Sequence, residues 1–140
     1  MLRKHLGSMD KIANLIIALK NASAVGKEKV FLPYSRMTVE IAELLKKEGY
    51  VKAVKVQAKD ENPASKYVEI IVAYDEAGKP KVREVERVSK SSKRVYAGVS
   101  DIKPFRQGKG LRILTTPKGI LTDKEAKKEH VGGEVLFTIF

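Results

Sequence analysis

A short surface segment of this sequence combines two hydroxyls, a proline, a lysine and a glycine. Thr115 and Thr116 carry the hydroxyls and Lys118 carries a cation. Pro117 presets φ at the second position of a tight turn, and Gly119 closes that turn. Such a loop can hydrogen-bond to sugar and base edges while its cation contacts a phosphate. The alternative is an ordinary turn whose threonines bond only to nearby backbone groups.

Ordered elements are expected on both sides of this loop. The segment before it, Leu111–Thr115, reads as a strand. Thr122 and Glu125 form a capping box, which predicts that a short helix begins there. Gly132-Gly133 then indicates a helix stop with a close approach of backbone. The loop should therefore be held between rigid elements.

The composition points to a polyanionic partner. The formal net charge is +11 over 140 residues, and such a balance in a small chain favours nucleic acid. The alternative is a solvated cationic surface. The chain is 43% hydrophobic with no Trp, so its core should consist mainly of Val, Ile and Leu.

Residue types that support catalysis or metal binding are sparse. The sequence has no Cys, and its two histidines, His5 and His130, lie far apart, so we predict no metal, no cofactor and no catalytic residue. Asp123 and Glu125 resemble an acid–base pair, but acids in the first turn of a helix favour its dipole. Because no apolar run approaches the length of a membrane span and no signal-peptide core is present, we expect a cytoplasmic protein without membrane contact.

The periodicity predicts an α+β protein: an N-terminal α/β layer of two helices on a small sheet, and a mainly β C-terminal half with one short helix. Ile12, Leu15, Ile16 and Leu19 have helical spacing, and Ser35 is a plausible N-cap for the second helix. The predicted strands are Lys29–Leu32, a segment around Val54 and Val56, Tyr67–Tyr74, Val82–Val88, Arg94–Val99, Leu111–Thr115 and Glu134–Phe140.

The predicted boundary between the halves is the turn-rich segment 75–80, because it breaks both periodicities. We therefore predict domains at residues 9–76 and 77–140. Residues 1–8 are either a tag or a natural basic extension.

Four segments resemble one known family in order and spacing. They are Asp10–Asn14 leading to Lys20–Ala22, Glu40–Tyr50, Val88–Lys90 with Arg94–Tyr96, and Leu114–Ala126 followed by Gly132–Glu134. Together they resemble small-subunit ribosomal protein eight of the bacterial type, the primary rRNA-binding protein of the small subunit's central domain. The resemblance runs from about Asp10 to Phe140.

The resemblance implies a structural protein of the small ribosomal subunit, located in the cytoplasm, that helps to assemble the subunit. Its implied partners are a stem in the central domain of the rRNA, neighbouring small-subunit proteins and the messenger of its own operon. The implied rRNA-binding residues are Thr115, Thr116, Pro117, Lys118, Gly119, Glu134, Tyr96, Lys90 and Arg94. The family usually has Ser-Thr-Ser where this chain has Thr115, Thr116 and Pro117, and Pro117 supplies neither a hydroxyl nor an N–H.

Three alternatives remain open. Glu134 is either an RNA contact or a solvated acid at a strand edge, and Tyr96 is either a stacking surface or a half-buried packing residue. For the protein as a whole, the alternative to a ribosomal protein is a free-standing RNA- or DNA-binding regulator. A DNA-binding regulator requires a basic recognition helix, whereas the helix beginning at Asp123 is short and starts with acids.

Overall fold

The computed structural model describes the backbone of residues 2–140 and all side chains in that range except those of residues 2–10 and Pro63. The first eight residues, predicted to be a tag or an extension, therefore lie outside the part whose side chains are described. The chain forms two compact units, one of residues 10–83 and one built on residues 84–140.

The two helices of the N-terminal unit follow from local sequence signals. Helix α1 (Leu2–Val25) buries Ile12, Leu15, Ile16 and Leu19, so the predicted apolar spacing is confirmed. Helix α2 (Arg36–Lys47) begins at Ser35, whose hydroxyl accepts a hydrogen bond from the Thr38 N–H at 3.1 Å. The predicted N-cap is therefore confirmed.

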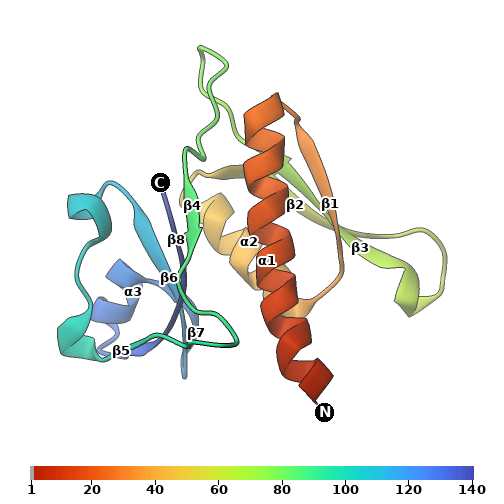
Figure 1. Ribbon diagram of the computed structural model, residues 1–140. Coiled ribbons are helices and arrows are strands. Elements are labelled where there is room, and N and C mark those ends of the chain that lie inside the picture. The colour runs from red at the N-terminus through yellow and green to blue at the C-terminus, as the bar shows by residue number, and fades with distance from the viewer. Residues whose placement is uncertain (1) are drawn as a thin grey trace. The chain divides into compact units, whose positions relative to one another are not determined.

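The N-terminal sheet contains β1 (Lys29–Pro33), β2 (Val51–Ala58) and β3 (Lys66–Val72), all antiparallel, in the order β1-β3-β2. The 3₁₀ turn η1 (Pro63–Ser65) precedes β3. Burial alternates along β1, and the buried apolar residues of β1 and β3 form the core of this unit with residues of α1 and α2: Val30, Leu32, Val68, Ile70 and Val72. Figure 1 shows this sheet with the two helices of the same unit.

A hydrogen-bonded hairpin follows β3. Tyr74 and Pro80 form a β-bridge, and the Asp75 carboxylate accepts from the Lys79 N–H at 2.8 Å. This hairpin lies within the unit that ends at Arg83, so the predicted boundary at 76/77 stays a prediction.

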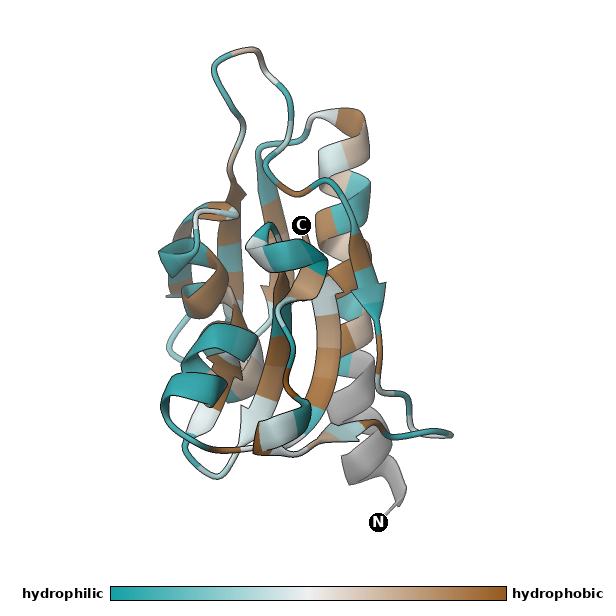
Figure 2. Cartoon of the chain, turned by 90° about the vertical axis from the view of Figure 1, so that its left-hand side faces the viewer, coloured by the Kyte–Doolittle hydropathy of each residue, from teal (hydrophilic) through white to brown (hydrophobic). Residues whose placement is uncertain are grey.

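The C-terminal unit is a five-stranded antiparallel sheet with one short helix. Its order is β4-β8-β6-β7, and β5 also pairs with β8. The bounds are β4 (Val85–Arg87), β5 (Tyr96–Ala97), β6 (Leu111–Thr116), β7 (Gly119–Thr122), α3 (Asp123–Lys128) and β8 (Gly133–Ile139), with 3₁₀ turns η2 (Val99–Asp101) and η3 (Phe105–Gly108). Figure 2 shows hydrophobic residues along the strands and hydrophilic ones on the turns. The predicted α+β class is confirmed.

Two local features differ from the prediction. The capping box is present, with the Thr122 hydroxyl accepting from Glu125 N–H at 3.1 Å, but a strand, β7, lies between the loop and the helix. Residues 132–133 do not stop the helix. His130, at φ 57°, takes the left-handed position that follows the last turn, and the two glycines have another role, described below.

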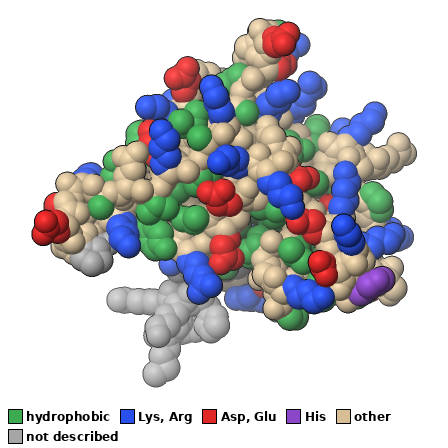
Figure 3. All heavy atoms as spheres, turned by 180° about the vertical axis from the view of Figure 1, so that it is seen from behind, with side chains coloured by type: hydrophobic (Ala, Val, Ile, Leu, Met, Phe, Trp, Pro, Cys, Tyr) green, Lys and Arg blue, Asp and Glu red, His purple; other side chains and the backbone are tan. Residues whose placement is uncertain are grey.

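Basic side chains are numerous on the surface. In Figure 3, Lys and Arg side chains are spread over the visible face. Within the residues searched, no helix is long and apolar enough to cross a membrane.

Candidate nucleic-acid interface

Three of the predicted contact residues lie side by side across three strands. Glu134 on β8 is directly opposite Thr115 on β6 and directly opposite Tyr96 on β5. Residues opposite each other in antiparallel strands project to the same face, with Cβ atoms about 5 Å apart. We call Thr115, Glu134 and Tyr96 the cross-strand row. The sheet therefore unites side chains separated by up to 38 positions, since the row runs from residue 96 to residue 134.

Two glycines permit this close arrangement. A Cβ on Gly133 would collide with the carbonyl oxygen of Thr115, and one on Gly132 would collide with that of Ala97. Each glycine thus admits the backbone of a neighbouring strand that any side chain would push away. The close approach predicted from Gly132-Gly133 is confirmed, and it occurs on both sides of β8.

Glu134 is neither solvated nor at an edge, because β8 is flanked by strands on both sides and the residue is 8% exposed. The alternative of a solvated edge acid is therefore wrong. An Arg94 Nη1 atom lies 3.3 Å from Glu134 Oε1 and 3.4 Å from Oε2, and the Arg94 side chain is 35% exposed. The carboxylate holds the guanidinium in place while leaving part of it open to solvent.

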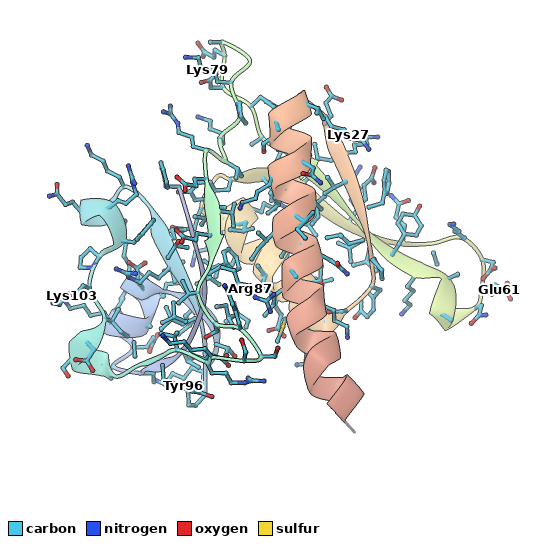
Figure 4. The ribbon with its side chains drawn as sticks, in the orientation of Figure 1. Lys27, Glu61, Lys79, Arg87, Tyr96 and Lys103 are labelled. Carbon is cyan, nitrogen blue, oxygen red and sulfur yellow. The ribbon has the colours of Figure 1, made fainter. Side chains whose placement is uncertain are left out.

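Tyr96 is exposed rather than half-buried. Its side chain is 68% exposed, and in Figure 4 it projects outward from the unit. The packing alternative for Tyr96 is therefore wrong.

The segment leading to Arg94 is fixed by a buried serine. Ser89 is 1% exposed, and its hydroxyl accepts from the Val95 N–H at 2.9 Å and donates to the Val95 carbonyl at 3.2 Å. Between them the chain turns at Lys90 and Lys93, whose backbones bond to each other in both directions. Lys90 is exposed on this turn, and no described side-chain contact joins it to the cross-strand row. The positioning role of Ser89 has no local signal in the sequence.

The turn after β6 uses one of its two hydroxyls for its own structure. Thr116 donates to the Gly119 carbonyl at 2.8 Å and accepts from the Lys118 N–H at 3.1 Å. Its one proton is committed, so Thr116 keeps only acceptor capacity for a ligand. The Thr115 hydroxyl, in contrast, has no hydrogen-bond partner among the described residues. Thr115 is the more available of the two.

Lys118 folds back toward helix α3. Its ammonium lies 3.3 Å from a carboxylate oxygen of Glu129, and both side chains are about half exposed. An exposed pair of this kind contributes little to stability, so the ammonium can exchange this partner for a phosphate at low cost. Pro117 is exposed between Thr116 and Lys118.

Asp123 has a structural role that sequence reasoning missed. The carboxylate is 1% exposed and accepts from the N–H groups of Phe105 and Arg112, at 3.2 and 3.4 Å. It anchors the basic loop before β6, where Arg106 and Gln107 take positive φ. Asp123 is therefore not available to a ligand, and the first turn of helix α3 contains two acids, Asp123 and Glu125, beside Lys124.

These features define a class. Small α+β units, a strongly basic surface and an exposed group of hydroxyl, aromatic and cationic side chains are typical of proteins that bind nucleic acid. Among the described residues, no group of three or more His, Asp or Glu is arranged to hold a metal ion.

Comparison with known proteins identifies the family. The family described as Ribosomal protein S8 matches residues 10–140. "Small ribosomal subunit protein uS8" of Rhodopseudomonas palustris (strain BisB5) is 42% identical over 136 residues, covering 96% of this chain and 100% of the relative. The proteins of the same name from Nitrobacter hamburgensis and Bradyrhizobium sp. (strain ORS 278) are 40% and 41% identical over the same shares of each chain. The chain belongs to the ribosomal protein S8 family. It is a non-enzymatic structural protein of the small ribosomal subunit.

Proposed function

We propose that this protein binds a stem in the central domain of small-subunit rRNA directly, through its C-terminal unit, and thereby helps to assemble the subunit. The cross-strand row carries the proposal. It presents a half-buried Thr115 hydroxyl that bonds to no described residue and an exposed ring at Tyr96, and Glu134 between these two residues holds the Arg94 guanidinium. Hydroxyl, ring and cation match the sugar, base and phosphate of one nucleotide.

Each residue has a distinct role in this proposal. Thr115 both donates to and accepts from sugar and base edges, while Thr116 accepts only. Tyr96 stacks on a base or packs on a sugar. Lys90, Arg94 and Lys118 contact phosphates. Glu134 acts chiefly by orienting Arg94, since its carboxylate is largely buried against that guanidinium.

Pro117 and Gly119 shape the loop rather than bond through side chains. Gly119 has φ 114°, which favours glycine, and Pro117 has neither a hydroxyl nor an N–H to offer. The third hydroxyl of the usual family tripeptide is therefore missing from the contact. We place specificity on Thr115 and Thr116.

A DNA-binding regulator is less well supported. Helix α3 has six residues, its first residue is buried, and the Lys124 ammonium is bonded to the Gly108 carbonyl at 3.2 Å. Its first turn contains two acids and one lysine, whereas a helix that enters a major groove has a basic N-terminal part. Contact with neighbouring small-subunit proteins, and binding of a messenger hairpin that imitates the rRNA stem, belong to the proposal through the family resemblance.

Photo-cross-linking of the intact protein to small-subunit rRNA tests the assignment. We expect cross-linked peptides to include Tyr96 and the segment 115–119, because these groups are exposed next to one another. Cross-links confined to α1 and its neighbours would contradict the assignment to the C-terminal unit. An unrelated RNA of equal length is the control, and it should give weaker and more scattered cross-links.

A further inference from the structure

The N-terminal sheet has a second face that carries exposed aromatic rings. On β1, Val30 and Leu32 point into the core, so Phe31 and Pro33 project to the other face. Pro33 pairs with Tyr67 of β3, which therefore projects to that face as well. The rings of Phe31 and Tyr67 have centroids 5.9 Å apart with planes at 58°, and Phe31 is 58% exposed. Two aromatic rings thus stand next to each other on adjacent strands, outside the core.

These rings border a groove large enough for a nucleobase. The groove has a volume of about 530 Å³, within the range of sites that hold small planar ligands. It is lined by Phe31, Leu32, Pro33, Lys59, Ala64, Ser65, Lys66 and Tyr67. Three of these residues, Lys59, Ala64 and Ser65, belong to the connection between β2 and β3.

A polar network holds the Tyr67 ring in position. Its hydroxyl donates to Gln57 at 2.7 Å, and the Gln57 amide donates to Glu69 at 2.9 Å. Glu69 is 6% exposed and also lies 3.4 Å from the Lys29 ammonium. The Lys29 ammonium therefore balances the negative charge of Glu69 on this face. The hydrogen bonds fix the Tyr67 ring in position before a base stacks on it.

The rim of the groove is basic. Lys59 and Lys66 line it, and the Lys66 ammonium lies 5.4 Å from the centre of the Tyr34 ring. The other acids of this region, Asp60 and Glu61, are in the loop between the strands, and Figure 4 shows Glu61 at its tip. Lysine is depleted in the cores of protein–protein interfaces, whereas lysines beside exposed rings are typical of surfaces that bind single-stranded nucleic acid.

We propose that this groove binds an unpaired RNA base, which stacks on Phe31 and Tyr67 while Lys59 and Lys66 contact the adjoining phosphates. The site is a second RNA contact, in the N-terminal unit, with its own residues. It rests on the proposed function in that RNA is the partner. It differs in what it recognises: a single-stranded base rather than a stem.

Binding of the full-length protein to an oligonucleotide of about ten adenosines at fixed salt tests the site. Phe31→Ala removes the exposed ring, and we expect affinity to fall about tenfold. Phe31→Tyr retains a ring and should keep the affinity. Ile17→Ala, which shortens a side chain 53% exposed on α1 and away from the groove, is the matched control and should have no effect. An abasic oligonucleotide of equal length should bind weakly and equally to all variants, because only phosphates remain.

Equal affinity of wild type and Phe31→Ala for the adenosine oligonucleotide would overturn the proposal. So would an abasic strand that binds as well as the adenosine strand. If Phe31→Ala leaves RNA binding intact but blocks entry of the protein into subunits, the occupant is another protein and the RNA site is wrong. A Tyr96→Leu variant separates this site from the cross-strand row. It should weaken binding to the rRNA stem and leave binding to the adenosine oligonucleotide unchanged. The stem therefore tests the cross-strand row, and the adenosine oligonucleotide tests the groove.

Discussion

The Arg94 guanidinium lies 3.3 Å from the carboxylate of Glu134, in a sheet where Glu134 is opposite both Thr115 and Tyr96. A buried acid on the middle strand of three, with a hydroxyl on one side and an aromatic ring on the other, thus holds a partly exposed cation. The site is therefore more than a loop with threonines. It is one end of a sheet, positioned by backbone pairing.

Substitution of Arg94 should destabilise the protein more than substitution of its partner Glu134. Arg94→Ala leaves a largely buried carboxylate without its cation, and we expect the free energy of unfolding to fall by about 1–2 kcal/mol, below the range for fully buried pairs because Arg94 is partly exposed. Glu134→Gln removes the buried charge and keeps an acceptor, so its cost should be smaller. Urea unfolding of the two variants checks the order. A greater loss for Glu134→Gln would contradict the role assigned to the pair.

Gly133→Ala should disrupt the C-terminal sheet, because the new methyl group collides with the Thr115 carbonyl. We expect a loss of about 2–3 kcal/mol in the free energy of unfolding, as for other overpacked sites. Gly98→Ala is the matched control. Its Cβ would have only an ordinary contact of 3.5 Å, with Asp101, so its effect should stay within about 0.5 kcal/mol. Similar losses for the two variants in thermal and urea unfolding would show that close approach is not the reason for glycine at 133.

Local signals in the sequence were sufficient where the structure depends on near neighbours. The N-cap at Ser35 and the capping box at Thr122 and Glu125 are bonds across three residues, and both are present as predicted. Strand β7 was missed because it has four residues, too few for its alternation to stand out between a turn and a helix. The expected helix end at about Glu129 is confirmed, but the left-handed residue after it is His130 rather than one of the two glycines.

Long-range pairing determined what the sequence left open at the site. Glu134 is buried because its strand has a neighbour on each side. The paired residues on these neighbours are Tyr96, which lies 38 positions earlier in the sequence, and Thr115, which lies 19 positions earlier. Nothing next to Glu134 in the sequence indicates Arg94 as its partner. The turn uses the Thr116 hydroxyl for its own hydrogen bonds and leaves that of Thr115 for a ligand, and the sequence does not indicate which of the two the turn uses.

Tyr74 should make the stability of the N-terminal unit sensitive to alkaline pH. Its hydroxyl lies 2.6 Å from the Lys27 carbonyl and 3.2 Å from that of Ala22, and burial, followed by the nearby Glu28 carboxylate, raises the pKa of Tyr74 above its ordinary value. The folded protein therefore keeps this proton at a pH where the unfolded chain has lost it. The stabilisation is complete below the unfolded pKa of about 10 and is lost as pH rises through the folded value.

Tyr74→Phe measures this contribution. At neutral pH the variant should be less stable by about 0.5–1.5 kcal/mol, the net value of a hydrogen bond. The difference between wild type and variant should shrink as the pH rises beyond about 10. Denaturant unfolding of both proteins between neutral and alkaline pH provides the comparison. A difference that stays constant across the titration would rule out the assigned role of the hydroxyl.

The most direct test of the central claim compares Thr115→Val with Thr116→Val in binding titrations on the central-domain stem and on a scrambled stem at the same salt. Valine has nearly the shape of threonine without the hydroxyl. We expect Thr115→Val to cost about 1–3 kcal/mol, tenfold or more in affinity, on the cognate stem. It should cost much less on the scrambled stem, where phosphate contacts remain, and should leave stability nearly unchanged because no described residue bonds to that hydroxyl. Thr116→Val should weaken cognate binding and also lower stability, since the turn loses two hydrogen bonds. Equal affinity of Thr115→Val and wild type for the cognate stem, or an equal loss on both stems, would contradict the claim that this end of the sheet reads the RNA.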